Sequence, residues 1–451
     1  MKITGIDIGE YRQFKNIKFD FTYPEGHSKA GQPLEKVCFI GQSGTGKTTL
    51  LNVIWEFFKV VDDALQVKIS KAPTHLNFNG SLLLGPYVDI HLLVGGDKIL
   101  FYNEGDLIER DKPESIRVAN MIDWLKPIID DVLPVEKLCL FIEDNVVGVS
   151  SRYLQKQENS EDELFDNSLT NNKKEKRKKD YDLVKRSKSV SVSYELAQYF
   201  WQFVLSDIHE FDEELKQIAI EMLRLNSLTP AKLQSRINSW QLEHTNPRLE
   251  LAQKCLNPIL EKLYLELDVD EVREPVAIKT KSGVSVPNQD LSTGTKQLLA
   301  TAIAVYKSEI DGGVILFDEP ERSLFPDVQR ELVKYYTGLA PDAQFFFATH
   351  SPIIAAAFEP CERFILYFDE NGEVKFHNGI APEGDDPNDI LRQDFGMEYL
   401  MLQKGLEEYE RYRQLAMQIR VETDEEKKNQ LIVERLELGN RYNFAGQYAK
   451  N

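Results

Sequence analysis

A glycine-rich segment is the first stretch of this chain whose residue types and spacing could do chemistry. Residues 41–49 read G-Q-S-G-T-G-K-T-T and fit the pattern G-x-x-x-x-G-K-[S/T]. Glycines let successive backbone N–H groups turn toward phosphate oxygens, a lysine can neutralise the β- and γ-phosphates, and a threonine hydroxyl can ligate Mg²⁺. The residues predicted to contact nucleotide are Gly41, Gln42, Ser43, Gly44, Thr45, Gly46, Lys47, Thr48 and Thr49.

The flanking residues fit the same interpretation. Residues 37–40 form an apolar run typical of a strand, and residues 49–54 have helical character. A helix that starts directly after the loop would direct its N-terminus at the phosphates. A chance glycine turn before a helix is the alternative, but strand, loop and helix all agree with the motif. The segment therefore predicts a phosphate-binding loop (P-loop) that holds a nucleoside triphosphate.

Adjacent carboxylates at the end of an apolar run form a second candidate group. Residues 314–317 read V-I-L-F, and Asp318 and Glu319 follow directly. Ligands of open α/β sheets bind at the carboxyl ends of the strands, so both side chains are expected at that edge. Asp318 is predicted to hold Mg²⁺ directly or through water, and Glu319 to polarise the attacking water as a general base. A solvated turn before a helix is the competing interpretation.

A histidine ends another apolar run. Residues 344–352 read Q-F-F-F-A-T-H-S-P, a buried type of strand with a polar tip. A neutral imidazole at His350 could contact the γ-phosphate and sense its loss. A structural histidine at the end of a strand is the alternative. The other six histidines show no ligand spacing; they are His27, His75, His91, His209, His244 and His377.

The segment 291–297, L-S-T-G-T-K-Q, resembles the L-S-x-G-x-x-Q signature of ABC-type ATPases. P-loop, signature, the Asp318–Glu319 pair and His350 follow one another in that family's order. The resemblance implies ATP and Mg²⁺ as cofactors and a dimer or larger homo-oligomer. It also implies that Ser292 and Gly294 bind the γ-phosphate of the ATP held by a neighbouring subunit. It covers residues 1–105 and 270–395, places residues 323–326 at the D-loop, and assigns no residue to the Q-loop glutamine.

The spacing of these motifs separates branches of the family. Residues 41 and 291 are too far apart for a transporter ATPase, and the segment between them is too short and too broken by Pro and Asn for long heptad arms. The run F-D-E-P-E-R-S-L-F-P-D-V-Q at 317–329 resembles the RecF- and OLD-like ATPases. The short helical tail is similar to that of the ATPases of Septu anti-phage systems. This resemblance implies an antiviral ATPase that regulates a separate nuclease.

Two further functions remain open at this stage. One is a RecF-like DNA-repair ATPase that binds DNA ends or gaps, and the other is a non-enzymatic scaffold stabilised by ATP. A nuclease within the chain is disfavoured, because the acidic pairs at 369–370 and 385–386 leave too little chain for a TOPRIM domain and no HNH-like cluster is present.

The expected fold class is α/β: a P-loop NTPase of ABC-ATPase type, with a mixed sheet, an antiparallel β lobe, a helical insertion and a short helical tail. We predict a first ATPase lobe at 1–105, a helical insertion at 106–246, a second ATPase lobe at 247–397 and a helical hairpin at 398–451. Within the insertion, residues 155–188 change from acidic to basic. We expect a mobile, charged loop there, and contact with DNA phosphates or an acidic partner is the alternative.

Composition limits the remaining possibilities. The formal net charge of −19 argues against a whole-surface nucleic-acid binder. The four cysteines are scattered without C-x-x-C spacing, as in a reducing cytosol. No apolar run is long enough to span a membrane and no secretory signal opens the chain, so we expect a cytoplasmic protein without a membrane partner.

Overall fold

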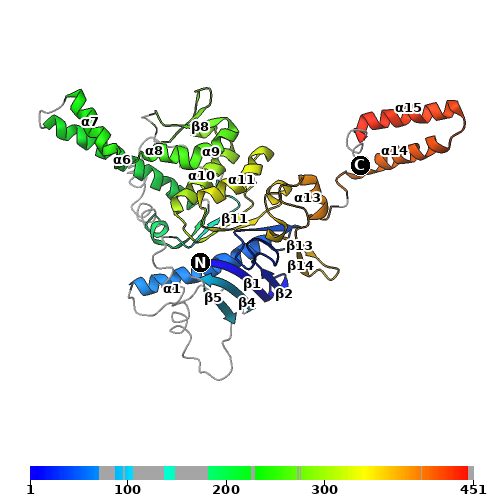
Figure 1. The fold of residues 1–451 in the computed structure, drawn as a ribbon, viewed down its shortest axis with the longest axis horizontal. Helices are drawn as coiled ribbons and strands as arrows, with labels where there is room; N and C mark the ends of the chain where they lie inside the picture. The colour runs from blue at the N-terminus through cyan, green and yellow to red at the C-terminus, as the bar shows by residue number, and fades with distance from the viewer. Residues whose placement is uncertain are drawn as a thin grey trace, which may run out of the picture. The chain divides into compact units, whose positions relative to one another are not determined.

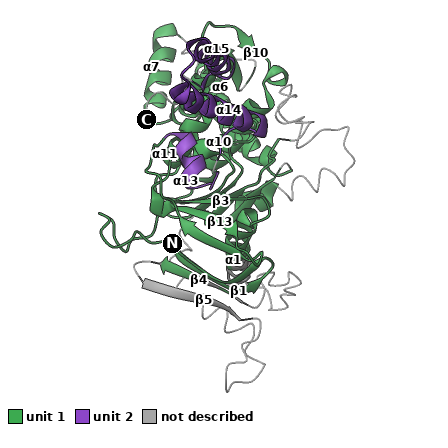
Figure 2. Cartoon of the chain, turned by 90° about the vertical axis from the view of Figure 1, so that its right-hand side faces the viewer, with its two compact units in different colours: residues 1–385 green, residues 386–451 purple. Residues whose placement is uncertain are grey.

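The computed structural model describes residues 1–70, 87–94, 97–104, 137–147, 181–193, 195–224, 229–271, 274, 276–397 and 399–444. The chain divides into two compact units, Met1–Asp385 and Asp386–Asn451 (Figure 2). Each unit has its own elements and is described separately below.

A seven-stranded sheet of order β14-β13-β3-β12-β11-β6-β7 is the centre of the first unit (Figure 1). All neighbouring pairs are parallel except β13 and β14, which are antiparallel. In chain order the strands are β3 (Lys36–Gly41), β6 (Cys139–Ile142), β7 (Ser189–Val192), β11 (Val314–Asp318), β12 (Gln344–Ala348), β13 (Arg363–Phe368) and β14 (Val374–Asn378).

The inner strands are apolar throughout because both faces of the sheet are covered. Every residue of β6, β11 and β12 is buried. On one face, α1 (Lys47–Ser70) packs against the sheet in a cluster that includes Phe39, Leu316 and Phe346. On the other, Phe317 contacts Tyr336 of α11 (Pro326–Leu339) with ring centroids 4.4 Å apart.

A second, four-stranded antiparallel sheet of order β2-β1-β4-β5 belongs to the α1 side. Its strands are β1 (Lys2–Tyr11), β2 (Phe14–Asp20), β4 (Tyr87–Val94) and β5 (Asp97–Glu104). Residues of β1, β2 and β4 share one core cluster with α1 and with the large sheet. This core fixes α1, and therefore the loop before it, between the two sheets.

Helices cover the opposite face of the large sheet (Figure 1). They are α6 (Ala197–Arg224), α8 (Pro247–Glu250), the π-helix η2 (Leu251–Leu256), α9 (Asn257–Leu260), the 3₁₀ turn η3 (Glu261–Leu263), α10 (Thr293–Ser308) and α11 (Pro326–Leu339). The helix α7 (Pro230–Gln241) packs against α6 and projects away from the sheet. A small sheet of β8 (Leu265–Asp268), β9 (Ala277–Thr280) and β10 (Ser285–Val286) lies in the same part of the chain. The short helices η4 (Asn288–Asp290), α12 (Pro352–Ala355) and η5 (Pro360–Glu362) complete the unit.

Residues 106–246 are expected to form a helical insertion, but their described parts also contain strands of the large sheet. β6 and β7 lie within this segment and form one edge of the large sheet, next to β11. Residues 181–186, at the end of the expected charged loop, are helical. Amphipathic patterns from residue 194 to 223 and from 230 to 242 predict helices, and α6 and α7 occur there. Helical periodicity also predicts a helix near 121–129, which, like the rest of the charged loop, lies outside the described residues.

The amphipathic pattern of residues 247–267 predicts one long helix, but the helical turns end before residue 267. Helical turns run from Pro247 to Leu263, and Tyr264 then takes a left-handed conformation with φ 56°. The following residues form β8 and pair with β9. Strand pairing therefore outweighs helical periodicity at the end of this segment.

The second unit contains α13 (Pro387–Gln393), α14 (Gln403–Val421) and α15 (Glu425–Tyr442). α14 and α15 form the expected helical hairpin around a small core of Leu415, Leu438 and Phe444. Thr423 followed by Glu426 has the pattern of a capping box, but Asp424 caps α15 instead by accepting the N–H groups of Glu426 and Lys427. The unit starts at Asp386, earlier than the expected boundary at 397/398.

None of the helices in the described part of the chain is long and apolar enough to cross a membrane.

Candidate functional site

The loop between β3 and α1 has the backbone that a P-loop requires. Gly41, Gly44 and Gly46 have φ values of 142°, 87° and 97°, which side-chain-bearing residues rarely adopt. A Cβ at Gly41 would clash with the carbonyl oxygen of Leu366, and one at Gly46 would clash with the side chain of Gln13. Glycine is therefore required at both positions by conformation and by space.

The Lys47 side chain lies back over the loop that precedes it. Its Nζ donates to the carbonyl oxygens of Gly41 (3.0 Å) and Gln42 (3.1 Å), and the residue is only 6% exposed. Burial lowers the pKa of Lys47, and the nearby carboxylates of Glu319 and Asp318 oppose that shift. Gln42, Ser43 and Gly44 form the exposed tip of the loop, while the buried Thr45 hydroxyl donates to the Gln42 carbonyl at 2.8 Å.

Thr48 and Asp318 meet where a cation would be bound. The Thr48 hydroxyl donates to Asp318 Oδ1 at 3.1 Å, although 270 residues separate them. Burial raises the pKa of Asp318 to about 6, and the hydrogen bond from Thr48 opposes that rise. Two hard oxygen atoms at one point suit Mg²⁺, which takes few protein ligands and completes its shell with phosphate and water. Within the described residues, no group of three or more His, Cys, Asp or Glu side chains forms a fuller metal site.

Glu319 and His350 lie at the same carboxyl edge of the sheet. Glu319 has φ 47°, and its N–H donates to the carbonyl of Ala348, the last residue of β12, at 2.9 Å. The His350 side chain is largely exposed, and partial desolvation followed by the charge of Lys47 lowers its pKa, while Glu319 raises it. Lys47 and Glu319 therefore lie close enough to His350 to affect its charge.

Ser292 and Gly294 lie at the start of α10. Ser292 is the exposed N-cap of that helix, and its Oγ accepts the Thr295 N–H at 3.1 Å. Gly294 is buried, and a Cβ there would clash with the carbonyl oxygen of Ser323. In the single chain the glycine therefore allows the first turn of α10 to pack against the turn that follows Glu319. Contact of either residue with a neighbouring subunit's nucleotide stays a prediction.

Three residues that the sequence analysis did not single out also lie here. Gln13 Nε2 donates to Thr49 Oγ1 at 3.4 Å. Asp144 follows β6, pairs with Arg322, accepts a hydrogen bond from the Gln297 side chain at its carbonyl (3.1 Å), and raises the pKa of Asp318. Glu321 accepts the backbone N–H of His350. Asp144 could have been found, because it follows a buried apolar strand just as Asp318 does.

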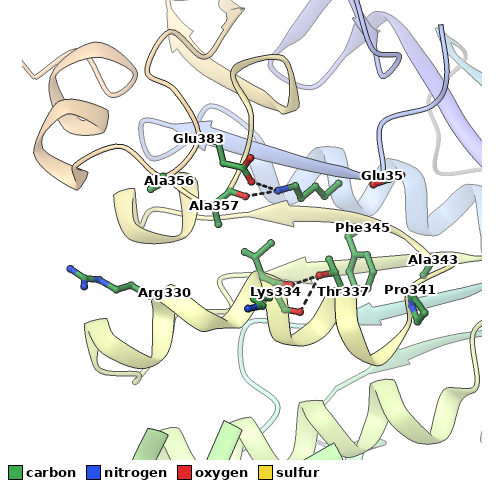
Figure 3. Close-up of a pocket in the computed structure, with 13 residues that line it drawn as sticks. Glu35, Arg330, Lys334, Thr337, Pro341, Ala343, Phe345, Ala356, Ala357 and Glu383 are labelled. Atoms are coloured by element: carbon green, nitrogen blue, oxygen red, sulfur yellow. Dashed lines mark hydrogen bonds and ion pairs between the residues drawn. The ribbon is translucent and has the colours of Figure 1, made fainter. Parts of the chain in front are cut away.

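A cavity of about 440 Å³ lies at the opposite, amino edge of the sheet, where β3 and β12 begin (Figure 3). It is lined by Glu35, Lys36, Arg330, Val333, Lys334, Thr337, Pro341, Ala343, Phe345, Ala356, Ala357, Glu383 and Gly384. Lys36 donates there to the Ala357 carbonyl (2.5 Å) and to Glu383 (2.9 Å). No predicted nucleotide-binding residue lines this cavity, so the candidate site rests on the loop geometry at the other edge.

Comparison with known proteins agrees with this geometry. Residues 135–355 match the family model described as AAA ATPase domain, a segment that contains the signature, Asp318, Glu319 and His350. With the P-loop geometry, the match identifies a P-loop ATPase fold with a mixed sheet, and it supports nucleotide binding and ATPase function. No curated protein matches the chain.

Two solved structures are similar at low identity. One is the Smc head domain with an extended coiled coil bound to the C-terminal domain of ScpA, derived from Pyrococcus furiosus. It is 13% identical, with a TM-score of 0.36, over 84% of this chain and 96% of the other. The second is the Smc head bound to the C-terminal winged-helix domain of ScpA, also 13% identical, with a TM-score of 0.37 over 84% and 97% of the two chains.

Proposed function

We propose that this chain is the ATP-binding and ATP-hydrolysing subunit of a cytoplasmic anti-phage defence system, and that its nucleotide state regulates a separate nuclease. The observation that carries the ATPase is the convergence of Lys47, Thr48, Asp318, Glu319 and His350 at one edge of the sheet. These residues come from three strand ends that are far apart in the chain, so a chance turn does not account for them.

Each side chain has a distinct task in this proposal. The P-loop N–H groups and Lys47 would bind the β- and γ-phosphates, and Thr48 with Asp318 would hold Mg²⁺, whose charge would offset negative charge that develops during hydrolysis. Glu319, next to Asp318 in the chain, would accept a proton from the attacking water. His350 contacts the γ-phosphate as a neutral imidazole, which its lowered pKa favours.

The second half of each site comes from a neighbouring subunit. Ser292 is exposed at the N-terminus of a 16-residue helix, where backbone N–H groups and the helix dipole favour an anion. The open P-loop tip, with Gln42, Ser43 and Gly44 exposed, leaves the γ-phosphate accessible to such a group. We therefore propose a homodimer or larger assembly in which Ser292 and Gly294 of one subunit close over ATP bound to the other. Hydrolysis is slow until that closure occurs.

Mixing two inactive variants tests this shared site. Lys47→Ala disables the P-loop but keeps the signature, and Ser292→Arg blocks the signature but keeps the P-loop. Each variant alone should hydrolyse little ATP, whereas an equimolar mixture should recover up to about a quarter of wild-type activity through mixed dimers with one intact site. If mixing restores nothing while wild type is active, then the site is complete within one chain.

The defence role rests on the resemblance of residues 317–329 and of the helical tail to the Septu ATPases. Its test is protection of cells against phage by the chain together with a nuclease encoded by an adjacent reading frame. Glu319→Gln should trap ATP, abolish turnover and change the level of protection. Full protection by this variant would instead support an ATP-stabilised scaffold. ATP-dependent DNA binding by the isolated protein, with a steep loss of affinity in salt, would support a RecF-like repair ATPase.

A further inference from the structure

The turn that follows Asp318 runs beside the end of β12 and is hydrogen-bonded to it twice. The Glu319 N–H donates to the Ala348 carbonyl at 2.9 Å, and the His350 N–H donates to Glu321 Oε1 at 2.8 Å. The turn is itself closed by a bond from the Arg322 N–H to the Glu319 carbonyl at 3.1 Å. The carboxylate of Glu321 is therefore the side-chain link between the candidate general base and the candidate phosphate sensor.

The surroundings of Glu321 act on the charge and position of its carboxyl group. Burial raises the pKa of its carboxyl group, and the hydrogen bonds from the His350 N–H and the Thr349 side chain oppose that rise. Thr349 is fully buried, and its own N–H donates to the Phe39 carbonyl of β3 at 3.1 Å. One side of the β12 end is thus fixed by the P-loop strand and the other by Glu321.

A second polar contact secures the residue after the histidine. The Ser351 hydroxyl donates to Gln329 Oε1 at 2.7 Å, and Gln329 Nε2 donates to the Leu324 carbonyl at 2.9 Å. The backbone is therefore held at residues 349, 350 and 351, while the His350 side chain itself is exposed. Exposed imidazoles sample several rotamers unless the backbone directs them.

We propose that Glu321 is a positioning residue for ATP hydrolysis: its carboxylate accepts the His350 N–H and so directs the imidazole toward Lys47 and Glu319, where the γ-phosphate would lie. The inference rests on the proposed ATPase function and deepens it. Glu321 touches neither nucleotide nor metal in this role, and it acts through the backbone of His350. Nothing in the sequence pattern of the P-loop, the signature or the Asp318–Glu319 pair assigns that task.

Steady-state kinetics of the full chain with MgATP tests the proposal. Glu321→Ala should lower kcat by about 10- to 100-fold, while ATP affinity changes less than about twofold, because the loop that binds ATP is untouched. Glu321→Gln should keep kcat within about threefold of wild type, since an amide oxygen can still accept the His350 N–H. Equal losses of kcat in the two variants would overturn the proposal, because they would show that the negative charge of Glu321 is needed and not its ability to accept a hydrogen bond.

A double-mutant cycle separates positioning from general stability. If Glu321 acts through His350, then Glu321→Ala should cost less than about twofold in a His350→Ala background. A full, additive loss in that background would contradict the inference. Glu362→Ala is the matched control, because Glu362 is also a buried glutamate that accepts a backbone N–H (Glu359, 2.9 Å), but at the opposite edge of the sheet. This control should lower stability while kcat changes less than about twofold.

A spectroscopic measurement does not depend on turnover. The chain has seven histidines, so selective ¹⁵N-histidine labelling gives few backbone amide signals, and His350→Ala identifies the relevant one. The His350 amide proton should move upfield in Glu321→Ala and stay within a few tenths of a ppm in Glu321→Gln. An unchanged signal in Glu321→Ala would overturn the positioning role. Absence of ATPase activity in the wild type, with the expected shift present, would instead count against the proposed function alone.

Discussion

At the scale of single residues, the candidate site contains ionisable side chains that are buried, where apolar surroundings do not stabilise their charged forms. Lys47 is supported by two loop carbonyls, and Asp318 by one threonine hydroxyl. Burial lowers the pKa of Lys47 and raises the pKa of Asp318, so both shifts favour the neutral form of the side chain. A bound Mg²⁺-nucleotide would supply the opposite charges that each group lacks, so binding and folding of this region are thermodynamically linked.

Lys47→Ala should weaken MgATP binding by at least about tenfold, which corresponds to about 1.4 kcal/mol or more. The cause is the loss of a cation that can move from the loop carbonyls to the phosphates. Isothermal titration calorimetry with wild type and variant measures the effect. Lys59→Ala on the same helix removes an exposed lysine that pairs loosely with Glu56, and it should leave ATP affinity unchanged.

Asp318→Asn should stabilise the metal-free, nucleotide-free protein. The pKa of Asp318 rises from 3.8 to about 6 on folding, because the protonated carboxyl group is favoured in the folded state. The stability that the protonated side chain gives is present in full below about pH 4 and is lost as pH rises through about 6. At pH 8 the ionised side chain costs up to about 3 kcal/mol, and at pH 5 about half of that. Urea unfolding at the two pH values measures the variant's advantage. A lower stability of Asp318→Asn at pH 8 would contradict the assigned burial.

Residue patterns predicted much of the candidate site, because several motif residues come at or just after the end of an apolar strand. Asp318, Glu319 and His350 all occupy such positions, and the structure brings them to one edge with Lys47 and Thr48. Glu321 could not be predicted, since its partner is a backbone N–H that lies 29 residues away. That contact exists only because β11 and β12 pair in one particular register.

At the scale of elements, close approach between α10 and the turn around Ser323 constrains the signature. Gly294 leaves no space for a side chain, and Ser323 itself has φ 62°. Any movement of the Asp318–Glu321 segment therefore pushes on the first turn of α10, which carries Ser292. In the proposed dimer, this contact would link the candidate hydrolytic residues of one subunit to the surface that carries Ser292.

Gly294→Ala should destabilise the protein by about 1–3 kcal/mol, because the new methyl group overlaps the Ser323 carbonyl and forces α10 to shift. Gly338→Ala provides the matched control in α11. No neighbouring atom lies within 4 Å of the position that a Cβ would occupy at that helical glycine, so alanine should stabilise by about 0.5 kcal/mol through helix propensity. Denaturant unfolding of both variants should give changes of opposite sign.

Strands that carry a clear apolar pattern or that end in a chemical motif were predictable, and the two short strands β6 and β7 were not. The strands β1, β2, β3, β4, β11 and β12 occur close to where apolar patterns place them. β6 and β7 are four residues each, too short for a period, and they lie between segments of helical pattern. β11, which pairs with β6 in the sheet, begins more than 120 residues after β7 ends, so the local pattern does not show that these strands join the sheet.

At the scale of the whole molecule, net charge affects assembly. Two copies of a chain with a formal charge of −19 repel each other, and salt screens that repulsion. If ATP holds subunits together through Ser292 and Gly294, then the association has to overcome this cost. DNA binding would show the opposite dependence, since counterion release makes it weaker as salt increases.

The ATP-bound Glu319→Gln variant should therefore self-associate at least as tightly at 300 mM NaCl as at 50 mM NaCl. The Debye length is roughly 6 Å at the higher concentration and roughly 14 Å at the lower one, so charge repulsion is screened more strongly at 300 mM. Analytical ultracentrifugation with ATP and Mg²⁺ measures the dissociation constant. Lys47→Ala under the same conditions should remain monomeric. Dissociation at the higher salt concentration would indicate that attractive ion pairs dominate the interface.

The strand order also has a consequence for how the protein is made. The P-loop strand β3 is translated early, but both of its neighbours in the sheet, β12 and β13, come about 300 residues later. At roughly 5–20 residues per second, a nascent chain waits about 15–60 seconds before that strand can find either one. During this interval the apolar β3 segment lacks both of its sheet partners, so a truncated chain that ends before β12 should expose it and be prone to aggregation or chaperone binding.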